Sequence, residues 1–335
     1  MKKFIIKLLV TCAPVLAVFA VSVFTPPTPR ASKSLLMSSI RKTDLLEITP
    51  SPRIVFIGGS NLSFGLNSQM IRDALNMNPV NTAIHKKIGL KFMLDSTLAH
   101  IIQGDIVVLV PEYGLFYKSL DTSSVELARM VFDVDINNLR YLNLSQCFNT
   151  LKFLPEYAVS KLKLNEYLFY SDSDIYSVNS FNQYGDVDAH WGLANREFAQ
   201  PSSISGHFNH RAVNHIKALQ ATLAGKGVRF FVSFPCMQAT AFEDSASQIS
   251  EVEHELRKAG LNILGSPGRY KMPDALFFNT VYHLNKQGVD IRTARIIQDI
   301  QTALYGAVPA KDASPPPVHH SITRSPAILF TCRNG

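Results

Sequence analysis

The sequence predicts an α/β protein in which a mainly parallel sheet lies between two layers of helices, a three-layer α/β/α fold. Strand-like apolar runs alternate with segments whose apolar residues recur every three or four positions, from 53 to 110 and again from 210 to 305. The run Asp-Ile-Val-Val-Leu-Val at 105–110 is apolar without alternation, as a strand buried on both faces of a parallel sheet requires.

In the first half, the helical pattern is clearest at 89–103, where apolar residues follow i, i+3, i+4 spacing. We expect strands at 53–58, 80–84 and 105–110, with helices at 67–76 and 89–103. Each strand is followed by a polar or glycine-containing turn, so the order strand–helix–strand–helix–strand indicates parallel neighbours joined by helices.

Residues 118–200 interrupt this alternation. They are rich in aromatic residues, including Phe169 and Tyr170, with helical spacing in places, which predicts a mainly helical insertion or lid. Its last part, 182–192, is a polar cluster with the only tryptophan, and is either a substrate contact or a structured loop. The alternation then resumes, with strands expected at 228–234 and 261–264 and helices at 210–223, 245–259 and 286–305. Together, 51–305 form the predicted α/β domain, and the Pro- and Ser-rich residues 306–335 a disordered tail.

The N-terminal residues 1–30 predict a signal-anchor or a signal peptide. Lys2 and Lys3 precede an apolar run from Phe4 to Phe24, whose length at 1.5 Å per residue would just cover a hydrocarbon core of about 30 Å. The basic flank favours an N-terminus inside and a domain outside the cytoplasm, anchored to the membrane or secreted after cleavage. A polar linker with a short helical stretch is expected over 31–50.

Composition excludes some classes of function. The 335 residues are 46% apolar and 18% charged, so the chain can bury a core. The formal net charge is +7, but the basic residues are scattered and no nucleic-acid motif is present, so DNA or RNA binding is not expected. An anionic lipid surface or an acidic polysaccharide remains compatible with the charge. Cys147 and Cys236 are expected to be free thiols, with a disulfide between them as the alternative.

Ser60 is the candidate nucleophile. It follows Gly58 and Gly59 at the end of the first strand, where a helix begins, so its hydroxyl would lie beside exposed backbone N–H groups. His85 and Glu112 also follow strand ends, and ligands of parallel sheets gather at that edge. We therefore expect these three residues to lie on one rim.

A serine needs a base to accept its proton, and His283 is the candidate. It lies in a short polar turn between an apolar run and the last helix, which places it on a loop. His207, His210 and His215 lack nearby carboxylates and do not predict a metal site.

Gly58-Gly59-Ser60-Asn61 after the first strand, with Tyr282-His283-Leu284-Asn285 before the last helix, resembles the SGNH/GDSL hydrolase superfamily. More narrowly, the chain is similar to the membrane-anchored branch that includes the D-alanyl transfer protein of lipoteichoic acid synthesis and accessory proteins of polysaccharide O-acetylation. The resemblance covers about residues 50–305. It implies a flavodoxin-like fold, a nucleophilic Ser60 and His283 as its base.

In that superfamily an acidic residue shortly before the histidine orients the imidazole, but Asn279 and Thr280 stand at that place. An amide can orient a histidine, as in Cys-His-Asn proteases. We expect Asn279 to accept the Nδ1–H of His283, with Asp274 as the alternative orienter and a Ser60–His283 dyad as a third arrangement.

The superfamily also forms an oxyanion hole from the serine N–H, a glycine after the second strand and an asparagine after the third. Here the second-strand loop contains two lysines before its glycine, and Pro-Glu-Tyr follows the third strand. Backbone N–H groups of the lysines and the hydroxyl of the tyrosine are the expected replacements. The expected oxyanion or substrate-binding residues are Asn61, Lys86, Lys87, Gly89 and Tyr113.

The resemblance and the N-terminus together imply a serine-dependent acyl-esterase or acyltransferase of the cell envelope. It would act on O-acyl groups of a glycan, teichoic acid or lipid without cofactor or metal, with a membrane-bound O-acyltransferase as partner. The alternative is a non-catalytic glycan-binding or scaffolding subunit, motivated by Asn279 and the missing oxyanion asparagine. A phosphate-binding turn at Gly58–Ser60 is disfavoured, because the turn has neither a P-loop lysine nor a full G-x-G-x-x-G.

Overall fold

The computed structural model describes residues 1–168, 175–200 and 203–306. The predicted tail beyond Gly306, together with Phe169 and Tyr170 of the insertion, lies outside the described residues.

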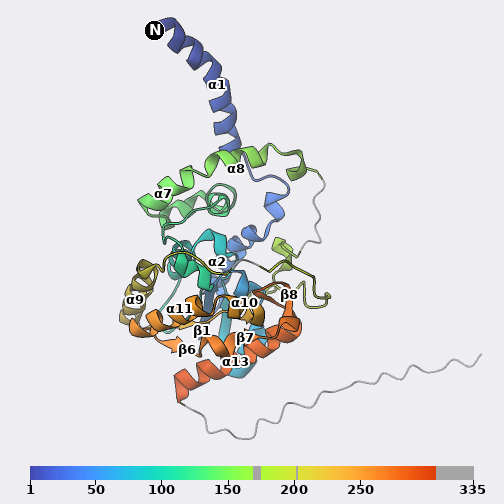
Figure 1. Ribbon diagram of the computed structural model, residues 1–335, viewed down its shortest axis with the longest axis vertical. Helices are drawn as coiled ribbons and strands as arrows, with labels where there is room; N and C mark the ends of the chain where they lie inside the picture. Colours follow the sequence, from blue (N-terminus) through green and yellow to red (C-terminus); the bar gives the residue numbers. More distant parts are fainter. Residues whose placement is uncertain (169–174, 201–202, 307–335) are drawn as a thin grey trace, which may run out of the picture.

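A five-stranded sheet with the order β2-β1-β3-β4-β6 forms the centre of the molecule (Figure 1). All four neighbouring pairs are parallel. Helices flank this sheet, which confirms the predicted α/β/α class. The strands are β1 (Arg53–Gly58), β2 (Asn78–Asn81), β3 (Ile106–Val110), β4 (Arg229–Ser233) and β6 (Ile263–Leu264).

The connecting helices occur where the sequence predicts them, although α5 ends at Leu98 instead of 103, and β2 lies at Asn78–Asn81 instead of 80–84. The last helix, α13, packs against α4 and β6, while α9 packs against β4 and α11. The helices that flank the sheet are α4 (Ser68–Leu75), α5 (Leu90–Leu98), α9 (His210–Gly225), α11 (Ala246–Lys258) and α13 (Lys286–Tyr305).

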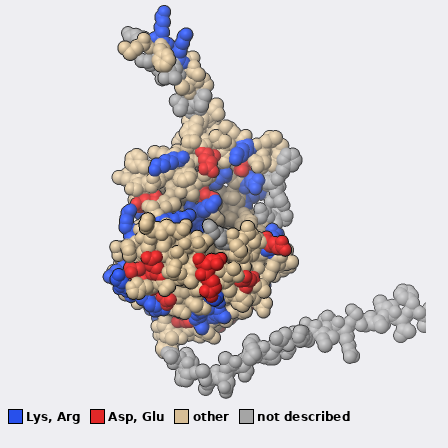
Figure 2. Space-filling view, viewed as in Figure 1, with Lys and Arg blue, Asp and Glu red and all other residues tan. Residues whose placement is uncertain are grey.

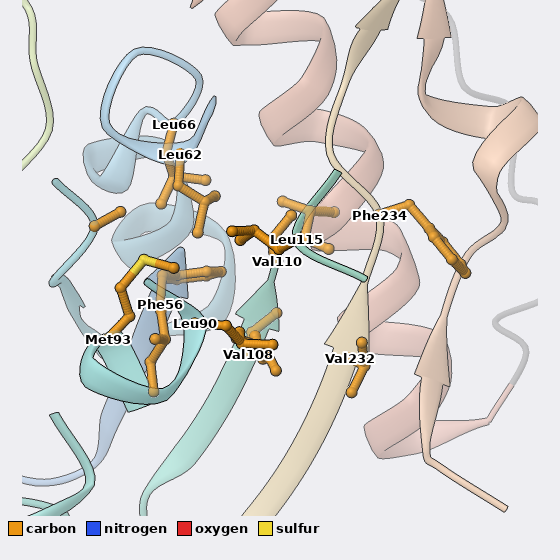
Figure 3. Packing of buried hydrophobic residues seen from close by; sticks show 14 of the residues in the cluster. Phe56, Leu62, Leu66, Leu90, Met93, Val108, Val110, Leu115, Val232 and Phe234 are labelled. Atoms are coloured by element: carbon orange, nitrogen blue, oxygen red, sulfur yellow. The ribbon is translucent and has the colours of Figure 1, made fainter. Parts of the chain in front are cut away.

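The core lies against the two central strands. Every residue of β1 and β3 is buried, because helices cover both faces of the sheet. Figure 3 shows Phe56 and Val108 from these strands packed with Leu90 and Met93 of α5, and with Leu62 from the turn after β1. This packing fixes the end of β1, where the candidate nucleophile begins.

Residues 31–50, expected as a polar linker with a short helical stretch, are folded against the body of the molecule. They form η1 (Ala31–Lys33), η2 (Leu35–Met37) and α2 (Ser38–Ile48). Leu46 of α2 is buried in the main core, and the buried Lys42 ammonium donates to the carbonyl oxygens of Asn81, Ala83 and Gly185. The folded unit therefore begins well before β1.

The insertion is helical only in its first half. In Figure 1, α7 and α8 lie between α1 and the α/β part of the molecule. Residues 175–200 contain one short 3₁₀ turn and two isolated β-bridges, so this half of the predicted lid is irregular. The helical elements are α6 (Val125–Arg129), the π-helix η5 (Met130–Val134), η6 (Ile136–Tyr141), α7 (Leu144–Leu151), α8 (Leu154–Lys161), η7 (Leu164–Glu166) and η8 (Val178–Ser180).

The N-terminal helix α1 (Lys2–Phe24) extends away from the body (Figure 1). Its end is attached to the insertion, since Val23 packs with Ala128 and Tyr157, and the Lys161 ammonium donates to Thr25 O at 2.6 Å. Among the described residues, no helix has the length and apolarity that crossing a membrane requires. The predicted span over Phe4–Phe24 is thus not confirmed, and the side chains of its residues 5, 8, 9, 15 and 16 lie outside the description.

The mixed surface charge on the face shown and the free cysteines agree with the sequence prediction. On the face seen in Figure 2, basic and acidic side chains are interspersed rather than gathered into one basic stripe. Cys12, Cys147 and Cys236 are free thiols.

Candidate active site

Two glycines at the end of β1 allow a close approach to the neighbouring strand ends. A Cβ on Gly58 would lie 2.7 Å from the carbonyl oxygen of Val110. A Cβ on Gly59 would lie 2.9 Å from Glu112 Oε1 and 3.1 Å from the backbone nitrogen of Lys86. The chain can therefore pass between these groups only without side chains, and it then turns directly into α3 (Ser60–Ser63).

Side-chain hydrogen bonds hold the short helix α3 in place. Asn61 Nδ2 donates to Val110 O at 3.2 Å, and Ser63 Oγ donates to Ala83 O at 2.6 Å. These bonds connect the turn to the end of β3 and to the loop that follows β2. Asn61 is buried and does not line the cavity beside Ser60, so it positions the turn rather than contacting substrate as predicted.

The candidate base comes from a small antiparallel hairpin formed by β8 (Phe277–Thr280) and β9 (His283–Leu284). Thr280 Oγ1 accepts hydrogen bonds from the backbone N–H groups of Tyr282 and His283, which fixes the turn. Asn279 lies on the strand before this turn and His283 on the strand after it, so their side chains come together.

Asn279 holds the imidazole. Its Oδ1 lies 2.9 Å from Nδ1 of His283, and its Nδ2 donates to the hydroxyl of Tyr176 at 2.8 Å. Because Oδ1 can only accept, Nδ1 of His283 carries the proton and Nε2 is left with its lone pair. The Asp274 carboxylate instead accepts from the backbone N–H and the hydroxyl of Thr240, so the geometry favours Asn279 over Asp274 as orienter.

The ring of His283 is packed among other rings. Its ring stacks on Phe64 with a centroid distance of 4.1 Å, and Phe64 also contacts His190. Burial, reinforced by His190, His85 and Lys86, lowers the pKa of His283 to about 3. His283 is therefore neutral at physiological pH, the form that a general base needs.

Ser60 and His283 line one cavity of about 500 Å³. His85, Glu112 and Asn279 line the same cavity, so the strand-end residues do meet on one rim. Glu112 Oε1 lies 3.5 Å from Ser60 Oγ, and Oε2 forms an ion pair with the Lys86 ammonium at 2.9 Å. Glu112 is buried, so this ion pair supplies the charge balance next to the serine.

The predicted oxyanion residues divide into two groups. Lys86 lines the Ser60 cavity, and its backbone nitrogen lies close to Gly59, at 3.1 Å from the place that a Cβ there would take. Lys87 and Gly89 instead line a neighbouring cavity of about 230 Å³, and the Lys87 ammonium pairs with Glu126 at 2.8 Å.

Tyr113, a predicted oxyanion donor, lies away from the Ser60 cavity in this structure. Its side chain is buried, packs near Phe234 and does not line the Ser60 cavity. Its hydroxyl has no hydrogen-bond partner among the described residues, and burial raises the pKa of Tyr113 well above the usual value. The reason is that Tyr113 turns into the core at the start of η4 (Tyr113–Tyr117), whereas Glu112 faces the cavity.

No protein-family model matches the chain, and no curated protein matches it significantly.

The sequence did not predict the contacts that two residues of the site make. Glu112 was placed on the rim, but its contact with Ser60 and its pairing with Lys86 were not predicted. Its position two residues after a buried strand was the available signal. Tyr176 comes from the irregular part of the insertion, where no periodicity marks one tyrosine among many.

Proposed function

We propose that this protein is a serine acyl-esterase or acyltransferase that works through an acyl-serine intermediate. One observation carries the proposal: Asn279 holds Nδ1 of His283, which leaves Nε2 unprotonated, and His283 lines the same cavity as Ser60. That arrangement suits nucleophilic catalysis, in which an oriented base activates a hydroxyl.

In the first step, Ser60 Oγ attacks the ester carbonyl while His283 Nε2 takes the hydroxyl proton. Collapse of the tetrahedral intermediate breaks the bond to the leaving alcohol, which receives that proton. In the second step, water or a sugar hydroxyl attacks the carbonyl of the acyl-serine and gives its proton to His283. The ester bond to Ser60 then breaks, His283 returns the proton to Ser60 Oγ, and the acid or the new ester leaves. Hydrolysis and transfer thus differ only in the acceptor.

Backbone N–H groups are the best hydrogen-bond donors to the oxyanion. The candidates are those of Ser60 and Lys86, beside Gly59. A carboxylate next to a developing oxyanion would oppose the reaction. The Lys86 ammonium neutralises Glu112 at 2.9 Å, which reduces that penalty.

The setting we propose is the cell envelope outside the cytoplasm, on the strength of the basic and apolar N-terminus. O-acyl groups of a glycan, teichoic acid or lipid are the proposed substrates, and a membrane-bound O-acyltransferase is the proposed acyl source. These assignments rest on the family resemblance.

A second function, a non-catalytic glycan-binding or scaffolding subunit, is favoured by one feature. Asn279 is neutral, and a His283 pKa of about 3 means that protonation during catalysis is costly. A carboxylate at position 279 would offset that cost, and the chain lacks one there.

A fluorophosphonate probe separates the two functions. We expect covalent labelling of the native protein at Ser60, located by mass spectrometry, and no labelling of Ser60→Ala. Ser247→Ala is the matched control, because Ser247 is exposed on α11 and bonds only to its neighbour Gln248 in the described structure. Absent labelling of the native protein, or equal labelling of Ser60→Ala, favours the non-catalytic function.

A further inference from the structure

Much of the wall of the Ser60 cavity is apolar. Its apolar residues come from three places that are far apart in the sequence: residues 198–199 and 204 at and just beyond the end of the insertion, the start of α10 (Ala239–Asp244) with the preceding β5 (Met237–Gln238), and the hairpin turn beside His283. They are Phe198, Ala199, Ile204, Met237, Ala241 and Val281.

Several of the polar groups in the lining already have partners. Glu112 pairs with Lys86, Thr280 Oγ1 accepts from two backbone N–H groups, and Ser245 Oγ accepts from Ile204 N at 3.1 Å. A guest in this part of the cavity gains from apolar burial more than from hydrogen bonds.

The cavity is also large compared with the smallest acyl groups. About 500 Å³ is in the range of pockets that enclose whole small molecules, and an acetyl group would leave most of it to water against apolar walls. From the apolar lining, the size and the position beside Ser60, we propose that the site takes a medium-chain aliphatic acyl group, of roughly six to ten carbons. This inference rests on the proposed acyl-serine chemistry and specifies the acyl donor.

Two small side chains in the lining leave space for the acyl chain. Ala241 is buried at the cavity wall, and Ala199 is exposed in the segment that also contributes to the lining. Replacing either by leucine takes space from the chain. Each methylene that becomes buried raises the specificity constant about fourfold, so the preference should be steep until the cavity is filled.

The first test is a series of p-nitrophenyl esters from acetate to dodecanoate, with the full chain. We expect kcat/KM for octanoate to exceed that for acetate by at least about tenfold. Ala241→Leu and the milder Ala199→Leu should each lower the octanoate-to-acetate ratio by about tenfold, and shift the best substrate to a shorter chain. Ala224→Leu on the exposed side of α9 is the matched control and should keep the native ratio.

The second test needs no turnover. In a titration, the Ser60→Ala variant should bind sodium octanoate at least about tenfold more tightly than sodium acetate. Adding Ala241→Leu to this variant should weaken the binding of octanoate. Ser60-dependent turnover that is fastest with acetate, with no octanoate binding, overturns the chain-length inference and leaves the proposed function standing. Octanoate binding without any Ser60-dependent turnover supports the aliphatic pocket and overturns the proposed function.

Discussion

Asn279 and His283 face each other across the β8–β9 hairpin, with Oδ1 and Nδ1 2.9 Å apart. The amide is itself held by Tyr176, so its oxygen points at the imidazole. An amide in this position fixes the tautomer of the histidine but adds no negative charge.

Asn279→Ala should slow fluorophosphonate labelling of Ser60 by about 100-fold, because the imidazole loses its orienting acceptor. Asp274→Ala should change the rate by less than about twofold, since Asp274 binds Thr240. The measurement is the labelling rate at fixed probe concentration, with melting temperatures of both variants to exclude unfolding. A larger effect for Asp274→Ala would transfer the orienting role to Asp274.

The labelling rate should be nearly independent of pH from about pH 5 to about pH 8. An ordinary histidine, with a pKa near 6.5, would lose activity about tenfold per pH unit below that value. His283 has a pKa lowered to about 3, chiefly by burial and further by His190, His85 and Lys86, so it stays neutral over this range. The check is labelling in a series of buffers at constant ionic strength. A fall in rate beginning near pH 6.5 would show that the imidazole is more accessible to protons than its burial implies.

Stability should fall as the pH drops below about 6.5. Burial lowers the pKa of His190 to about 4 as well as that of His283 to about 3, so the unfolded chain binds protons first. The contribution is complete above the unfolded pKa and is lost progressively down to about pH 4 for His190 and about pH 3 for His283, at up to about 1.4 kcal/mol per pH unit for each histidine. Urea unfolding at several pH values measures this slope.

The buried Asp186, whose pKa is raised, contributes in the opposite direction, so the informative quantity is the difference between variants. His190→Gln should reduce the slope, because glutamine can still bond to Leu284 O and does not titrate. His254→Gln, at an exposed position, should leave the slope as it is. Equal slopes for the native protein and His190→Gln would contradict the prediction.

Gly59→Ala should reduce both labelling and stability. The added methyl group would meet the backbone nitrogen of Lys86 at 3.1 Å and Glu112 Oε1 at 2.9 Å, and such overpacking costs about 1–3 kcal/mol. We expect labelling to slow by at least about tenfold, because the shift displaces Ser60 from its neighbours. Gly268→Ala is the control, since a Cβ there meets nothing within 4 Å. Native labelling by Gly59→Ala would mean that this close approach is not needed.

The sheet could be predicted because its signal is local. Continuous apolar runs such as that of β3 and the periodicity of α13 can be recognised within each segment. The proximity of Ser60, Glu112 and His85 also followed, since parallel strands end at one edge. The contacts that determine the chemistry were harder to predict, because they depend on the direction of a single side chain. Glu112 faces the cavity and Tyr113, the next residue, faces the core, and nothing in the sequence separates them.

The packing of 31–50 was missed for a related reason. Its helix α2 is polar overall, and the residues that attach it include the buried Lys42, whose ammonium is bonded to three carbonyl oxygens. A lysine predicts exposure, so the sequence pattern indicated a linker. Burial lowers the pKa of Lys42 to about 7, which reflects the cost of holding that charge inside.

The hairpin that supplies His283 comes from the last part of the folded chain, whereas Ser60 comes from the first strand of the sheet. During synthesis, the serine leaves the ribosome long before its base does. A chain that has formed only β1 to β4 carries a serine with neither an oriented base nor the cavity wall formed by the hairpin. Under the proposed mechanism, Ser60 becomes reactive only once the hairpin has docked, so a cut that releases the hairpin should abolish its labelling.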